Sequence, residues 1–232
     1  MNWTWVVAAA LAYLIGSFPT AYVVALRWAG VDIRTVGSGN VGGSNMRAVQ
    51  GVWATIAVGV IDLLKGAGAV WLTVMMGLGT GAACVAAVAV VVGHDWSVWL
   101  SLQGGRGGAS SLGTLLVLFP LGFLWVVGFM AIGKLTRSTA VLHLCGVITL
   151  PAVAGLMRQG NGIVITLTVL AVIMVIKRLE ANQRFQVPLE MCNGLHAGPM
   201  KVGTGRARVY GRRLLLDRDS RWASDSQSSA ES

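Results

Sequence analysis

Long apolar runs alternate with short polar stretches along most of the chain. The apolar runs cover residues 5–28, 52–76, 81–92, 112–133, 142–157 and 163–176. A helix needs about 20 apolar residues to cross a bilayer, and fewer when neighbouring helices shield it. The pattern therefore predicts an all-α, polytopic integral membrane protein built as a helix bundle.

The number of spans depends on Pro120, which lies inside the fourth run. With one helix there, the chain has six spans, and Lys134 and Arg137 lie outside the cell. Cytoplasmic loops carry most of the Lys and Arg of membrane proteins, and proline breaks a helix. We therefore expect two short helices, 105–119 and 120–134. They give seven transmembrane helices, with the N-terminus outside and the C-terminus in the cytoplasm. Six spans remain the alternative.

The composition supports a membrane protein and changes the meaning of the net charge. Hydrophobic residues make up 55% of the chain and charged residues only 12%, against roughly 25% charged in soluble domains. Eight of the 18 Lys and Arg follow Glu180, and the others lie almost entirely between the apolar runs. The net charge of +9 is therefore typical of a cytoplasmic membrane face, and we expect no nucleic acid partner.

The chain divides into two parts by composition. Residues 1–180 form the membrane-embedded domain, and residues 181–232 form a basic tail without apolar runs. Such a tail is expected to be disordered and to lie near the headgroups of an anionic lipid membrane.

The first polar island, residues 37–51, combines glycines with neutral hydrogen-bonding side chains and one cation. Its members are Gly37, Ser38, Gly39, Asn40, Gly42, Gly43, Ser44, Asn45 and Arg47. Glycines let backbone amides converge on an anion, and an arginine fork matches phosphate oxygens. The island predicts phosphate binding, although an ordinary glycine-rich turn has the same glycines. No lysine follows as in a nucleotide P-loop.

The second polar island, residues 93–111, places a cation just before a helix. Arg106 is surrounded by Gly104, Gly105, Gly107 and Gly108. A helix N-terminus beside an arginine is a second anion site. His94, in the same island, is either an acid or base or an interfacial hydrogen-bonding group.

The acidic residues indicate ion pairing rather than metal binding. Asp62 and Lys65 share one helix face at i, i+3, where a structural ion pair is favoured over a catalytic role. Asp32, Asp62 and Asp95 are the acids before Glu180, and they are scattered. Divalent metals need convergent carboxylates, so we expect two phosphorylated ligands, no metal and no other cofactor.

Seven sequence strings follow one another within residues 11–179: IGSFPTAYVVA, DIRTVGSGNVGGSN, DLLKG, GHDWSVWL, GGRG, LTR and KRL. In this order they resemble the bacterial acyl-phosphate:glycerol-3-phosphate acyltransferases, the PlsY family. The resemblance implies a seven-helix fold in the bacterial inner (plasma) membrane, with active-site loops on the cytoplasmic side. It also implies transfer of a fatty acyl group from acyl phosphate to the sn-1 hydroxyl of glycerol 3-phosphate. The products are lysophosphatidic acid and phosphate.

The resemblance implies roles for the residues of both islands. We expect catalytic roles for Arg47, Arg106 and His94. The residues expected to bind substrate phosphate are Ser38, Gly39, Asn40, Gly42, Ser44, Asn45, Gly104 and Gly105. Acyl phosphate is an activated mixed anhydride, so the protein mainly has to position the reactants and neutralise the departing phosphate. We expect the protein to act as a monomer.

Several positions depart from the family pattern. Arg106 replaces the usual lysine, and Gln103 and Ala140 stand where members have lysine and serine. Val172 and Val175 replace a histidine and an asparagine of the last helix.

Two consequences of these valines are open. In a working enzyme, Lys177 or Arg178 is expected to contact the phosphates instead, because both can extend toward the cytoplasmic loops. The alternative is a catalytically weakened paralogue that still binds acyl phosphate or glycerol 3-phosphate. A transporter of phosphorylated small molecules is a further alternative. Paired broken helices would indicate a transporter, but the sequence predicts only one break, at Pro120.

Overall fold

A computed structural model of the chain describes residues 3–183, and these residues are helical with no strand. The helices are α1 (Trp3–Ser17), α2 (Thr20–Ala29), α3 (Gly43–Met75), α4 (Gly79–Asp95), α5 (Gly108–Leu118), α6 (Pro120–Leu135), α7 (Thr139–Leu156) and α8 (Asn161–Gln183). Two short 3-10 helices, η1 (Ile33–Thr35) and η2 (Val98–Leu100), lie in the connecting loops. Of the predicted tail, residues 184–232 lie outside the described part, while residues 181–183 continue α8.

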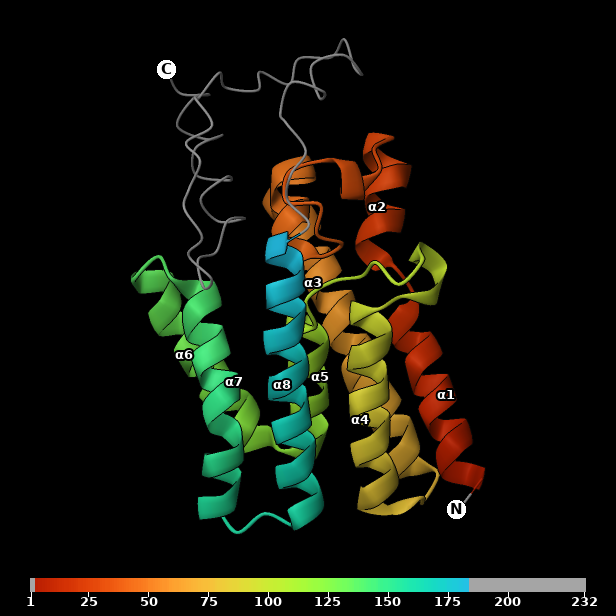
Figure 1. Cartoon of the computed structure of the whole chain (residues 1–232), viewed down its shortest axis with the longest axis vertical. Coiled ribbons are helices and arrows are strands. Elements are labelled where there is room, and N and C mark those ends of the chain that lie inside the picture. The colour runs from red at the N-terminus through yellow and green to blue at the C-terminus, as the bar shows by residue number, and fades with distance from the viewer. Residues whose placement is uncertain (1–2, 184–232) are drawn as a thin grey trace.

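The long helices run side by side as a bundle, with α6 and α7 at one flank and α1 at the other (Figure 1). α1 packs on α4, α3 on α5, and α8 on both α4 and α7. α2, the start of α3 and the end of α8 lie at the end of the bundle opposite the N-terminus (Figure 1). The two polar islands therefore meet at one end of the bundle.

Glycines at reciprocal positions bring two pairs of helices into close contact. Gly16 of α1 faces the backbone of α4, and Gly93 of α4 faces the backbone of α1. Gly66 of α3 and Gly113 of α5 form the same arrangement between those helices. A Cβ atom at any of the four positions would overlap a carbonyl oxygen of the partner helix. Small residues of this kind allow the close packing that associates helices in membranes.

The predicted helix break at Pro120 is confirmed. α5 ends at Leu118, and Pro120 is the first residue of α6. Proline fits the first turn of a helix because its missing N–H has no partner there in any case. Within residues 3–183, five helical segments are long and apolar enough to cross a membrane, and α5 and α6 are shorter apolar helices. Large apolar side chains such as Trp53 (83% exposed) and Leu135 (85%) face outward, as lipid contact requires.

Several predicted boundaries differ from the structure. The helix expected over 105–119 begins only at Gly108, since Gly107 has a left-handed φ of 68°. The first run, 5–28, is two helices, because Pro19 interrupts the helix between Ser17 and Thr20. α3 begins at Gly43, inside the first polar island, and bends at Gly51, whose φ is 82°. α8 continues past residue 176 to Gln183, which adds charged residues to its last turns.

Candidate active site

The two polar islands form the walls of one cleft, which holds about 560 Å³ of space. The lining residues come from the first loop, from the second loop and from the end of α8. They are Arg34, Thr35, Gly37, Ser38, Gly39, Asn40, Trp96, Ser101, Leu102, Gln103, Gly104, Gly105, Lys177 and Glu180. Backbone amides, neutral polar side chains and cations thus surround the same space, which suits an anionic ligand.

Asn45 holds the first loop in shape from behind the cleft wall. Its Nδ2 atom donates to the carbonyl oxygens of Ile33 (3.0 Å) and Val36 (2.9 Å), and its Oδ1 atom accepts from the amide of Ser38 (3.1 Å). The side chain is almost completely buried, with 1% exposed. Of the predicted phosphate ligands in this loop, Ser38, Gly39 and Asn40 line the cleft.

The other predicted residues of the first island surround these three. Asn40 Nδ2 donates to Ser44 Oγ (3.2 Å), and Gly42 is buried directly against the Asn40 side chain. Arg47 lies in the first turns of α3, and its side chain is exposed. In the described part of the chain, the cleft lining includes neither Arg47 nor Ser44.

The second loop is positioned by contacts that only glycine permits. Gly104 and Gly105 lie against the end of α4, where a Cβ atom would overlap the His94 carbonyl oxygen or the His94 imidazole respectively. The amide of Gly105 donates to the His94 carbonyl oxygen (3.0 Å). Both glycines line the cleft, and Arg106 follows directly, between this loop and α5. Within the described residues, Arg106 itself does not line the cleft.

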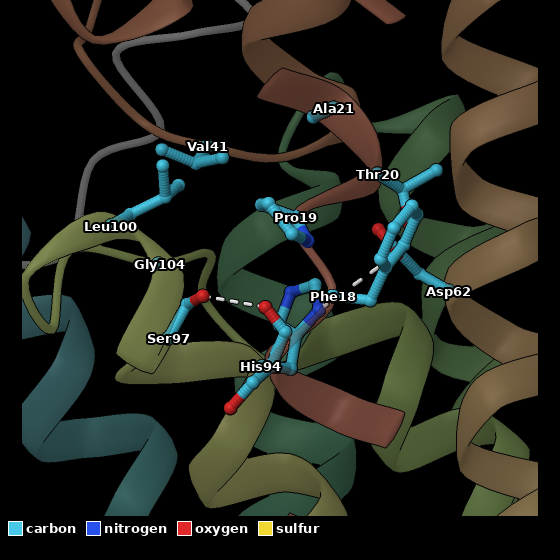
Figure 2. A pocket seen from close by; sticks show the side chains of 11 residues that line it. Phe18, Pro19, Thr20, Ala21, Val41, Asp62, His94, Ser97, Leu100 and Gly104 are labelled. Carbon is cyan, nitrogen blue, oxygen red and sulfur yellow. Dashed lines mark hydrogen bonds and ion pairs between the residues drawn. The ribbon is translucent and has the colours of Figure 1, made fainter. Parts of the chain in front are cut away.

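His94 belongs to a separate small cavity of about 10 Å³ beside the cleft. Figure 2 shows its side chain near Asp62, Ser97 and the Phe18–Pro19 segment. His94 Nδ1 lies 3.8 Å from Asp62 Oδ1. Gly104 lines both the small cavity and the cleft, so His94 lies behind the second loop and supports it.

The predicted Asp62–Lys65 ion pair is present. Lys65 Nζ lies 2.8 Å from Asp62 Oδ1, and both side chains are at least 90% buried. Lys65 Nζ also donates to the Phe18 carbonyl oxygen (2.6 Å), which accepts from the Thr20 amide as well (3.0 Å). The pair thus joins α3 to the break between α1 and α2, which is a structural role.

Two cations that line the cleft, Arg34 and Lys177, are each paired with a carboxylate. Arg34 Nη2 lies 2.6 Å from Asp32 Oδ2, and the Arg34 amide donates to Asp32 Oδ1 (2.9 Å). This hydrogen-bonded guanidinium holds the pKa of Asp32 below its usual value of 3.8. Lys177 Nζ lies 3.0 Å from Glu180 Oε2 and 4.7 Å from the centre of the Trp96 ring.

The end of α8 settles which of the two basic residues lines the cleft. Lys177 does so, whereas Arg178 Nη1 donates to the Ala140 carbonyl oxygen of α7 (3.2 Å). Val172 is 52% exposed, and Val175 packs on the apolar cluster between α5, α6, α7 and α8. The sequence signal for Lys177 was its place directly after the last apolar run.

No group of three or more His, Cys, Asp or Glu side chains that could hold a metal ion occurs within residues 3–183.

A model of the family described as glycerol-3-phosphate acyltransferase matches residues 6–186. The chain belongs to this family. A glycerol-3-phosphate acyltransferase 2 of Moorella thermoacetica is 46% identical over 121 residues, covering 52% of this chain and 62% of that protein. A second acyltransferase of this name, from Dehalococcoides mccartyi strain CBDB1, is 32% identical over 218 residues, covering 92% and 96%.

The fold is also that of a solved family member. A crystal structure of PlsY, an integral membrane glycerol 3-phosphate acyltransferase in its glycerol 3-phosphate form, superposes with a TM-score of 0.71. The match covers 83% of this chain and 94% of PlsY, at 24% identity. The chain is accordingly a membrane protein of the glycerol-3-phosphate acyltransferase family, with a helical fold over residues 3–183.

Proposed function

We propose that this protein transfers a fatty acyl group from acyl phosphate to the sn-1 hydroxyl of glycerol 3-phosphate. The products are lysophosphatidic acid, an early intermediate of phospholipid synthesis, and inorganic phosphate. The observation that carries the proposal is the cleft itself, where the loop around Ser38 and the loop around Gly105 face each other. Its polar amides and cations match substrates that each carry a phosphate group.

The reaction needs positioning and charge stabilisation more than a covalent enzyme intermediate. The sn-1 hydroxyl oxygen attacks the carbonyl carbon of acyl phosphate, and the bond between that carbon and the bridging phosphate oxygen breaks. The hydroxyl proton passes to the departing phosphate, so the substrate supplies its own base. Holding the two reactants in contact makes the step effectively unimolecular, and cations and amides stabilise the leaving anion.

The residues of the two loops share these tasks in the proposal. Ser38, Gly39 and Asn40 of the first wall and Gly104 and Gly105 of the second bind phosphate oxygens. Arg106, which follows Gly105 directly, and Arg47, at the start of α3, supply the positive charge. Gly42, Ser44 and Asn45 shape the first wall, and His94 supports the second.

The proposal places the protein in the inner membrane of a bacterial cell, as a monomer with seven membrane helices and a cytoplasmic C-terminus. This orientation puts the basic loops, including Lys134 and Arg137, on the cytoplasmic side. Single cysteines introduced near residues 79, 120, 137 and 160 are expected to label from outside, outside, inside and outside, in a background without native cysteines. Labelling of position 137 from outside would favour six spans.

Acyl transfer is tested directly with purified protein, palmitoyl phosphate and radiolabelled glycerol 3-phosphate. Radioactive lysophosphatidic acid and an equal amount of released phosphate are expected. The same assay with an acyl thioester as donor identifies the donor that the protein uses. Binding of glycerol 3-phosphate without transfer from either donor would contradict the enzymatic proposal and support a binding-only paralogue.

A further inference from the structure

Lys177 is the cation that α8 brings to the cleft between the two glycine-rich loops. Its side chain is only 3% exposed, and its ammonium group lies over the ring of Trp96 at 4.7 Å. An ammonium group removed from water requires a nearby anion or another compensating contact. Lys177 is thus a buried cation that needs a negatively charged partner beside the cleft.

In the structure one such charge is the carboxylate of Glu180, about one helical turn further along α8. The Lys177 Nζ and Glu180 Oε2 atoms are 3.0 Å apart, and the Glu180 side chain is 27% exposed. Glu180 itself lines the cleft. A carboxylate therefore occupies the position beside Lys177 that a phosphate in the cleft would approach.

The other ion pair of the cleft is built differently. Asp32 caps the 3-10 helix η1 by accepting from the Arg34 amide, and it also accepts from both Nε and Nη2 of Arg34. This carboxylate is tied to the backbone as well as to the guanidinium. The Glu180 carboxylate is held by the Lys177 side chain near the end of a helix, with no hydrogen bond from a backbone amide among those described. Of the two carboxylates, Glu180 is the easier one to exchange for a substrate anion.

We propose that Lys177 binds a substrate phosphate in the cleft, and that Glu180 forms an ion pair with Lys177 until the phosphate displaces the Glu180 carboxylate. The proposal rests on the proposed function and adds a phosphate-binding residue and its competitor. Phosphate carries up to two negative charges and three free oxygens, so it can bind Lys177 and the amides of the loop around Ser38 together. Trp96 keeps the ammonium group in place during the exchange through its ring face.

The test compares Lys177→Met and Glu180→Gln with the parent protein. Lys134→Met is the matched control, because Lys134 is an exposed lysine in the last turn of α6 and does not line the cleft. The measured quantities are kcat, the KM of glycerol 3-phosphate and the inhibition constant of inorganic phosphate. Titration calorimetry with inorganic phosphate supplies the binding constant without any need for turnover.

Lys177→Met is expected to raise the KM of glycerol 3-phosphate and the inhibition and dissociation constants of inorganic phosphate about tenfold or more, because one charged hydrogen bond is lost. The change in kcat should be smaller. Lys177→Arg should restore most of the binding, Glu180→Gln should tighten phosphate binding, and Lys134→Met should leave both constants unchanged. Unchanged phosphate binding in Lys177→Met would overturn the proposal. If that variant does not fold, unchanged binding in Glu180→Gln overturns it instead.

Failure of the proposed function is a separate result. A parent protein that transfers no acyl group but binds inorganic phosphate, with the binding lost in Lys177→Met, would refute the acyltransferase and leave the Lys177 site in place. If the parent transfers acyl groups normally, and Lys177→Met and Glu180→Gln have the same KM as the parent, the acyltransferase proposal stands and the Lys177 site is refuted.

Discussion

The first cleft loop, residues 32–45, is crossed by side-chain hydrogen bonds from Asp32 and Asn45. The second loop, residues 101–107, is fixed by backbone hydrogen bonds and by glycines packed against the end of α4. The first loop thus depends on side chains that make hydrogen bonds, whereas the second depends on the absence of side chains at its glycines. The first loop should be sensitive to truncation, and the second to any added side chain.

The largest effects are expected from the arginine that accompanies each loop. Arg47→Ala and Arg106→Ala should each weaken kcat/KM by about 1.5–3 kcal/mol, the range for a hydrogen bond to a charged group. Arg158→Ala, at the opposite end of the bundle between α7 and α8, should have no effect. Normal kinetics in both arginine variants at normal protein levels would contradict the assignment of phosphate contacts to the two loops.

Adding one methyl group to the second loop is expected to have the next largest effect. The Cβ atom of Gly105→Ala would overlap the His94 imidazole, and overpacking of this kind costs about 1–3 kcal/mol. Thermal unfolding in detergent and the acyl transfer rate should both fall. Gly59→Ala in α3 is the control, because its Cβ meets no atom within 4 Å and alanine favours a helix over glycine. If Gly105→Ala and Gly59→Ala are equally stable, the second loop is not held by close packing of Gly105 against His94.

Truncation should damage the first loop instead. Asn45→Ala removes two donors and one acceptor from a buried position and is expected to cost about 1–2 kcal/mol of unfolding free energy. Asn45→Asp should be no better, since a carboxylate faces the carbonyl oxygens of Ile33 and Val36. A fully stable Asn45→Asp variant would show that these two hydrogen bonds do not hold the loop.

The smallest effect concerns the pH dependence of the first loop. The Arg34 guanidinium lowers the pKa of Asp32 from 3.8, so the pair adds stability above that pH and loses it as the pH falls through the lowered value. Asp32→Asn should therefore be less stable than the parent at pH 7, by at most about 1 kcal/mol for a partly exposed pair. The difference should vanish in acid. Thermal unfolding at several pH values checks this, and a difference that persists below the lowered pKa would point to a cause other than charge.

Some of this architecture follows from the sequence because single residues decide it. Pro120 divides α5 from α6, and the i, i+3 spacing of Asp62 and Lys65 produces the expected ion pair. Both glycine-rich islands line one cleft, since the alternation of runs brings their ends to the same side of the bundle.

Other features could not be predicted from the pattern of apolar runs. Hydropathy measures transfer of side chains into lipid, whereas a helix ends where its backbone hydrogen bonds end. The apolar run therefore stops at residue 176, while α8 carries Lys177 and Glu180 through further turns. The inward role of Asn45 was equally hidden, because an asparagine in a glycine-rich stretch looks the same whether it faces a ligand or its own loop.

The break before Pro120 has a consequence for the surrounding membrane. The 11 residues of α5 extend about 16 Å, roughly half the hydrocarbon thickness of a bilayer. Phe119, in the turn between α5 and α6, is 2% exposed, and its amide donates to the Leu115 carbonyl oxygen (2.8 Å), so α5 ends tightly at this turn. In the proposed topology this flank creates hydrophobic mismatch, and lipids with shorter chains would fit it better. We therefore expect the stability of the folded protein to depend on bilayer thickness as well as on pH.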